Sequence, residues 1–168
     1  MFRPQIQKTY VLFLIALFNL LLIYISANSY EYIKKDGLNQ KMRATEIMSE
    51  CNKYLSKQRN IPKHDIYKSG LVGIESSYIT TILENDSINL RDSKVACTHP
   101  NFAALVVEMF QEIELEHNDS IAVSMTGSLP GANLAVLSAA KAMNLNVTLI
   151  SSVGSSAWGA NEENFSWL

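Results

Sequence analysis

The chain has 168 residues, of which 48% are hydrophobic and 18% are charged, and its formal net charge at pH 7 is −2. This length allows one domain and a membrane segment. The charge balance offers no clustered basic face of the kind that nucleic-acid binding normally requires, so we expect no nucleic-acid partner.

A nearly continuous apolar run occupies residues 10–27, with Asn19 in its middle. Such a run offers roughly 17–18 apolar-compatible residues, which is the short end of what a membrane-spanning helix needs. Tyr10 and Tyr24 lie where interfacial aromatic residues belong. We therefore predict a retained transmembrane anchor over residues 10–27. The alternatives are a buried core helix and a cleaved signal peptide, for which Ile25-Ser26-Ala27 is a weak cleavage site.

Basic residues flank this run on both sides and nearly balance. They are Arg3 and Lys8 before it, and Lys34, Lys35, Lys41 and Arg43 after it. Short positive N-terminal tails commonly stay in the cytoplasm, which favours residues 1–9 as a cytoplasmic tail. We accordingly expect a single-pass protein of the cell membrane with its domain outside the cytoplasm.

An amphipathic stalk helix is predicted over residues 28–60. Its apolar residues recur at three- and four-residue spacing: Leu38, Met42, Ala44, Ile47, Met48, Cys51, Tyr54 and Leu55. Pro62 ends it, because the residue before a proline is pushed out of the helical region. The stripe would serve as an oligomerisation surface or pack on the domain, and we favour packing.

Cys51 and Cys97 belong to no CxxC pair, and two isolated buried thiols are favoured over a disulfide. The three histidines, His64, His99 and His117, share no ligand spacing with them. We therefore expect no metal site, and we expect no cofactor.

Two short segments, Leu71–Ile74 and Tyr78–Ile82, are predicted as strands because they are rich in β-branched residues. Glu75, Ser76 and Ser77 lie between them. A carboxylate in this setting is a candidate general base, a candidate metal ligand or a hydrogen-bonded turn residue. The turn is favoured for Glu75, and Ser76 is kept as a candidate ligand-binding residue.

A helix is predicted from Pro100, since proline suits the first helical turn. One apolar stripe follows at helical spacing: Phe102, Leu105, Val106, Met109, Phe110 and Ile113. The glutamates of this segment fall largely elsewhere and are assigned to a solvated face.

The stretch from Ser120 to Trp158 predicts a strand, a glycine loop, an apolar helix, a second strand and a second glycine loop. This order fits a right-handed βαβ crossover between parallel strands. The predicted fold class is α/β: a transmembrane helix followed by a partial Rossmann-like parallel βαβ domain over residues 61–168. In open α/β sheets ligands bind outside the carboxyl ends of the strands, here at the loops Met125–Gly131 and Ser151–Ser156.

Hydroxyl and glycine residues of these loops are the candidate ligand-binding residues. Together with Ser76 they are Thr126, Gly127, Ser128, Gly131, Ser152, Gly154 and Ser155. The first loop leads into a helix N-terminus, where unpaired N–H groups and the helix dipole favour an anion. The pattern matches neither a P-loop nor GxGxxG, and Ser128 does not sit in a GxSxG elbow. Ser128 and Glu75 remain the candidate catalytic residues, although no histidine base for Ser128 is evident.

Four segments carry a resemblance to a known family: Gly73–Thr81, Asn101–Val107, Ser128–Leu137 and Ile150–Ala160. They resemble the poly-gamma-glutamate system protein family of bacteria, over about residues 65–168, and the N-terminal anchor also fits that family. The resemblance implies a membrane-anchored α/β protein that acts in the production, export or processing of γ-linked polyglutamate. Family members generally continue beyond the region matched here, so we expect the α/β domain to be incomplete.

Three functions follow as hypotheses. The leading one is a membrane-anchored accessory protein of poly-γ-glutamate (capsule or slime polymer) biosynthesis or export, binding the anionic polymer or an anionic precursor at the two loops. Its partners would be the membrane and the polymer's synthase or export proteins. The second is a hydrolase or transferase acting on the γ-amide through Ser128 or Glu75. The third is a non-enzymatic scaffold for the synthase.

Overall fold

The structure is a computed structural model that describes residues 8–30, 37–82 and 87–167. The chain forms two compact units, residues 1–35 and residues 36–168. Most of the expected cytoplasmic tail, and residues 31–36 of the expected stalk, lie outside the described residues.

The described part of the first unit, residues 8–30, contains the helix α1 (Thr9–Asn28), none of whose residues is buried. By length and composition α1 is a candidate membrane span, and a signal sequence near an N-terminus would look the same. At 1.5 Å per residue, its 20 residues reach about 30 Å, which matches the hydrocarbon core of a bilayer. Asn19 donates its side-chain amide to the carbonyl of Ile15 at 2.9 Å, so this polar group has a partner inside the helix itself.

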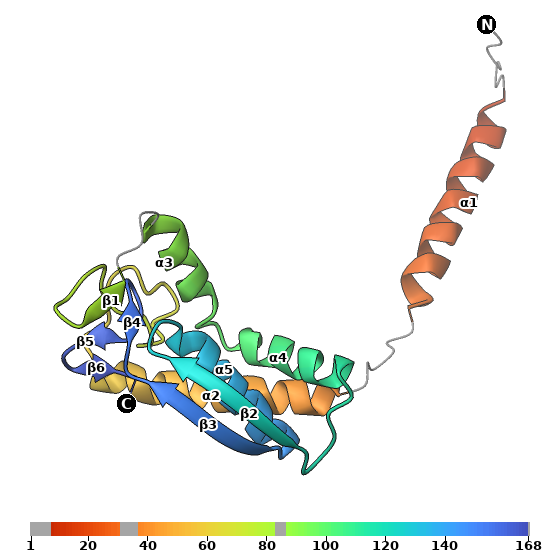
Figure 1. Ribbon diagram of the computed structural model, residues 1–168. Coiled ribbons are helices and arrows are strands. Elements are labelled where there is room, and N and C mark those ends of the chain that lie inside the picture. Colours follow the sequence, from red (N-terminus) through yellow and green to blue (C-terminus); the bar gives the residue numbers. More distant parts are fainter. Residues whose placement is uncertain (1–7, 31–36, 83–86, 168) are drawn as a thin grey trace, which may run out of the picture. The chain divides into compact units, whose positions relative to one another are not determined.

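Three helices form the main core of the second unit: α2 (Leu38–Gln58), α4 (Asn101–Glu112) and α5 (Pro130–Met143). The three helices lie against one another (Figure 1). Ala44 and Met48 of α2 belong to the core between them. The helix expected over residues 28–60 is shorter than predicted, because α1 continues to Asn28 and α2 begins at Leu38. Part of its apolar stripe packs on the rest of the unit, through Ala44, Ile47 and Met48, whereas Leu38, Met42 and Tyr54 are exposed.

The helix predicted from Pro100 is α4, but only part of its predicted stripe is buried. Ala103, Val106 and Val107 face the core, whereas Leu105 and Met109 are exposed. The buried face is centred on smaller residues because α2 and α5 both pack against α4. An exposed apolar edge therefore remains along this helix.

The predicted strand, helix and strand are β2 (Ser120–Thr126), α5 and β3 (Asn146–Ser152). β2 and β3 pair in parallel over seven residues, from Ser120 opposite Asn146 to Thr126 opposite Ser152 (Figure 1). Ile121 and Val147 pack against the core that contains α5, while alternate residues on the other face are exposed. The second unit thus combines helices with a parallel strand pair.

Short strands surround the carboxyl end of this pair. β1 (Thr80–Ile82) pairs in parallel with β4 (Ser155–Ser156), and β5 (Asn161–Glu162) pairs with β6 (Phe165–Ser166) in antiparallel fashion. The predicted strand at Leu71–Ile74 is wrong: this segment is buried at Leu71, Val72 and Gly73 but forms no ladder. Its polar backbone groups pair instead with the segment from Trp158 to Asn161.

One further helix, α3 (Ser87–Ala96), lies between β1 and α4 and was not predicted from the sequence. Val95 and Lys94 at its C-terminal end are buried. α3 packs against α5, which places its last turn beside the loops at the carboxyl ends of β2 and β3.

Candidate functional site

The loops that follow β2 and β3 are joined by hydrogen bonds. Gly127 donates its N–H to the carbonyl of Gly154 at 2.9 Å, and Ser156 donates its N–H to Ser128 Oγ at 3.0 Å. Ser155 Oγ donates to the carbonyl of Gly127 at 3.0 Å. We call these five residues the serine interlock. The two loops expected to meet at one edge of the sheet therefore do meet.

Close backbone approach makes the interlock compact. A Cβ on Gly159 would lie 2.5 Å from the carbonyl oxygen of Gly127 and 2.4 Å from Ser155 Oγ. Ala160 donates its N–H to the same Gly127 oxygen at 2.7 Å. Only glycine fits at position 159, because any side chain would push the two loops apart.

A buried lysine holds the second loop from the other side. Lys94 is 3% exposed, and its ammonium group donates to Ser156 Oγ at 2.6 Å and to the carbonyl of Ala157. Hydrogen bonds to a charged donor are stronger than neutral ones, so this contact ties α3 firmly to the loop. The ammonium group of Lys94 is thus in direct contact with the serine interlock, through Ser156.

Asn161 supports the interlock through the segment that precedes β1. Its side-chain oxygen accepts the N–H of Ile74 at 3.1 Å, and its amide group donates to the Ile74 carbonyl at 2.7 Å and to Thr80 Oγ1 at 3.0 Å. Trp158 donates its N–H to the same Ile74 carbonyl at 2.8 Å and has a left-handed φ of 63°. These contacts replace the strand ladder that the sequence predicted at residues 71–74.

Arg59, directly after the C-terminus of α2, contacts the segments around β5. Its guanidinium lies 3.6 Å from the centre of the Phe165 ring and bonds the Gly70 carbonyl and the Glu162 carboxylate. Burial lowers the pKa of Arg59 from its ordinary value, and the neighbouring carboxylates of Glu162 and Asp65 oppose that shift. The arginine is therefore a structural clamp on the loops around β5.

The candidate ligand-binding residues fall into two groups. Gly127, Gly131 and Ser155 are buried, and the polar groups of Gly127 and Ser155 already have protein partners. Thr126 and Ser152 are exposed opposite one another at the carboxyl ends of β2 and β3. Only the exposed or half-buried hydroxyls among these candidates are open to a ligand without movement of the loops.

Ser128 and Gly154 are half-buried and lie within the interlock. Ser128 Oγ accepts a hydrogen bond from Ser156, which leaves its own hydroxyl proton to donate. Together with Thr126 and Ser152, this serine presents three hydroxyl groups near the start of α5. Hydroxyls and helix N-termini are suited to an anion such as a carboxylate or a phosphate.

The remaining candidates lie elsewhere. Glu75 and Ser76 are exposed in the loop between Ile74 and β1. Gly131 packs against the backbone of Cys97 and Thr98, where a Cβ would come within 2.9 Å of the Cys97 carbonyl. Burial raises the pKa of the Cys97 thiol, and both cysteines are free thiols.

Sequence reasoning missed Lys94 and Asn161. The only local signal for Lys94 is a charged residue directly before the apolar run Val95-Ala96-Cys97, which suggests that its neighbours are buried. Asn161 gives no local signal, since its partners are distant in the sequence: Ile74 lies 87 positions away and Thr80 lies 81 positions away.

Comparison of the chain with protein-family models, with curated proteins and with solved structures found no match in any of the three.

Proposed function

We propose that this protein is a membrane-anchored accessory protein of poly-γ-glutamate biosynthesis or export. In this proposal it binds the anionic polymer, or an anionic precursor, at the carboxyl ends of β2 and β3. The partners would be the membrane and the synthase or export proteins of the polymer. α1 would span the cell membrane once, with residues 1–9 in the cytoplasm and the second unit outside it.

One observation carries the binding proposal. Thr126, Ser128 and Ser152 gather exposed or half-buried hydroxyls at the carboxyl ends of two parallel strands, beside the N-terminus of α5. This is the edge at which open α/β folds bind ligands, and it supports a Rossmann-like arrangement. The free α-carboxylates of a γ-linked glutamyl chain are acceptors that match hydroxyl and N–H donors.

Polymer-dependent stabilisation of the full chain in detergent tests the proposal. A ligand that prefers the native state raises the unfolding midpoint, so poly-γ-glutamate should raise it for the wild type. Thr126→Val combined with Ser152→Ala should abolish that increase. Ser120→Ala is the matched control, because Ser120 is also exposed on β2 but at its opposite end.

The outcomes separate the candidate functions. No increase in the midpoint for the wild type, or an equal increase with poly-α-glutamate, would contradict recognition of the γ-linked polymer. Shortening of the polymer by the wild type but not by Ser128→Ala would instead identify a hydrolase. Loss of cellular polymer only on substitution of the exposed face of α2 would identify a scaffold.

A further inference from the structure

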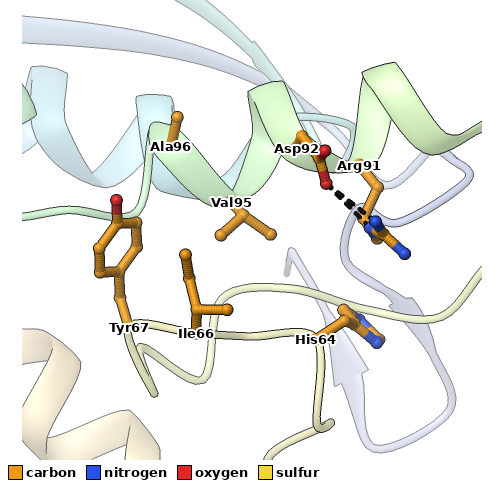
Figure 2. A pocket seen from close by; sticks show the side chains of 7 residues that line it. All are labelled: His64, Ile66, Tyr67, Arg91, Asp92, Val95 and Ala96. Atoms are coloured by element: carbon orange, nitrogen blue, oxygen red, sulfur yellow. Dashed lines mark hydrogen bonds and ion pairs between the residues drawn. The ribbon is translucent and has the colours of Figure 1, made fainter.

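A separate cavity of about 390 Å³ lies between α3 and the loop before Leu71 (Figure 2). His64, Ile66 and Tyr67 line it from the loop, and Arg91, Asp92, Val95 and Ala96 line it from α3. Its volume is in the range typical of small-molecule sites. None of these residues belongs to the serine interlock.

One end of the cavity is polar and is formed by Arg91, Asp92 and His64 (Figure 2). Arg91 donates to a single oxygen of Asp92, at 3.1 Å from Nε and 3.0 Å from Nη2. A guanidinium has further donors beyond these two. The side chain of Asp92 is 66% exposed, so its pairing with Arg91 is weak and easily displaced.

Trp158 lies against both basic side chains of this end. Its ring meets the ring of His64 edge-on at 4.9 Å, and the guanidinium of Arg91 lies 5.7 Å from its centre. The indole Nε1 is buried and has no hydrogen-bond partner among the described residues. A buried donor without an acceptor is unusual in native proteins.

The other end of the cavity is apolar. Val95, Ile66 and Tyr67 line it; Val95 is buried, whereas Ile66 is 69% exposed and Tyr67 is also exposed. The Tyr67 ring is held edge-on against His99 at 4.9 Å. An aliphatic group placed here would cover Ile66 and remove apolar surface from water.

We propose that this cavity, the Arg91 pocket, binds a carboxylate carried on a short aliphatic stem. The carboxylate takes the place of Asp92 on the guanidinium of Arg91, and the stem lies against Ile66 and Val95. A single charge is favoured over a doubly charged phosphate, because the Asp92 carboxylate stays nearby. A γ-linked glutamyl unit has this form, and that identification rests on the proposed function.

Calorimetric titration of the full chain in neutral detergent tests the pocket with defined probes. We expect 4-methylpentanoate to bind, and acetate and 4-methylpentanamide to bind at least about tenfold more weakly, since each lacks the stem or the charge. γ-Glutamylglutamate is the probe for the glutamyl identification.

Two variants and one matched control assign the site. Arg91→Gln should weaken the binding of 4-methylpentanoate about tenfold through loss of a charge-assisted hydrogen bond. Ile66→Ser should weaken it about threefold through loss of apolar contact, without harm to folding, because Ile66 is exposed. Arg43→Gln, which changes an exposed arginine of α2, should leave it unchanged. In the wild type, 4-methylpentanoate should also slow the modification of Arg91 by phenylglyoxal, and mass spectrometry would measure the extent of that modification.

Several results would overturn the proposal. Absence of saturable binding of 4-methylpentanoate, or equal losses in Arg91→Gln and Arg43→Gln, would show that no such pocket operates. If poly-γ-glutamate stabilises the chain while Arg91→Gln changes no binding, the proposed function stands and the pocket inference fails. If 4-methylpentanoate binds through Arg91 but γ-glutamylglutamate does not, the pocket stands and its glutamyl identification fails.

Discussion

A single buried amide organises the candidate site at the residue scale. Asn161 satisfies both backbone groups of Ile74 and the hydroxyl of Thr80, and it is fully buried. A buried polar group without a partner costs about 1–3 kcal/mol, so this network fixes one conformation of the loop before β1. Such pairing depends on residues far apart in the sequence. It could not be predicted from local composition, and the sequence instead predicted a strand at residues 71–74.

The glycines of the interlock give the first prediction. Gly159→Ala should lower the free energy of unfolding by about 1–3 kcal/mol or more, because its Cβ would overlap Gly127 and Ser155. Gly154→Ala is the control, since its Cβ would meet only Thr81, at 3.7 Å or more. Chemical denaturation of both variants measures the difference. Equal stabilities would show that the loops are not closely packed at position 159.

The half-buried thiol of Cys97 gives a prediction on pH. Its raised pKa means that the folded state holds the thiol proton more tightly than the unfolded state does. The contribution of Cys97 to stability is therefore complete below the usual thiol pKa and is lost as pH rises through the raised value. In Cys51→Ser, iodoacetamide should modify Cys97 with a pH midpoint above that of a free thiol. A midpoint at or below the ordinary value would contradict this burial effect.

At the scale of elements, α2 is part of the folded core. The sequence predicted its apolar stripe and left two roles open, of which packing on the domain is the one observed. Periodicity alone could not decide, because the same stripe would suit a partner helix. For α4 the predicted stripe was displaced around the helix, since it left out the buried Ala103 and Val107, and the neighbours that select the buried face come from distant segments. α3 lacks a strong pattern, and it was missed for that reason.

Two methionines of α2 test its role in the core. Met48 is fully buried, so Met48→Ala should lower the free energy of unfolding by about 2–5 kcal/mol through the cavity that it creates. Met42 is 55% exposed, and Met42→Ala should change it by less than about 0.5 kcal/mol. Thermal or chemical unfolding gives both values. A stable Met48→Ala variant would indicate that α2 does not belong to the cooperative unit.

At the scale of the whole molecule, the parallel pair of β2 and β3 is covered on one face. The other face carries Ala122, Ser124, Thr148 and Ile150, all exposed, and Ile150 is 70% exposed. Parallel sheets are normally covered on both faces. The strand, helix and strand could be predicted because their lengths and apolar runs are local properties. The bare face could not, because it depends on how the remaining elements pack.

The apolar helix α1 gives a prediction for the whole chain. Its length and composition predict that the full chain stays with membranes after an alkaline carbonate wash, whereas residues 31–168 alone appear in the soluble fraction. The measured mass of the chain from membranes should be that of the uncleaved protein. A mass shortened by cleavage near Ala27, together with release into the soluble fraction, would identify a signal sequence instead.

The chain contains two tryptophans, Trp158 and Trp167, and Trp158 is suited to serve as an intrinsic fluorescent reporter. The centre of the Trp158 ring lies 4.9 Å from the centre of the His64 ring and 5.7 Å from the guanidinium of Arg91, so we expect its fluorescence to respond to ligand binding beside Arg91. A carboxylate that replaces Asp92 on Arg91 would change the electrostatic surroundings of this indole. With Trp167→Phe, Trp158 emission would therefore report on the Arg91 pocket without any added label.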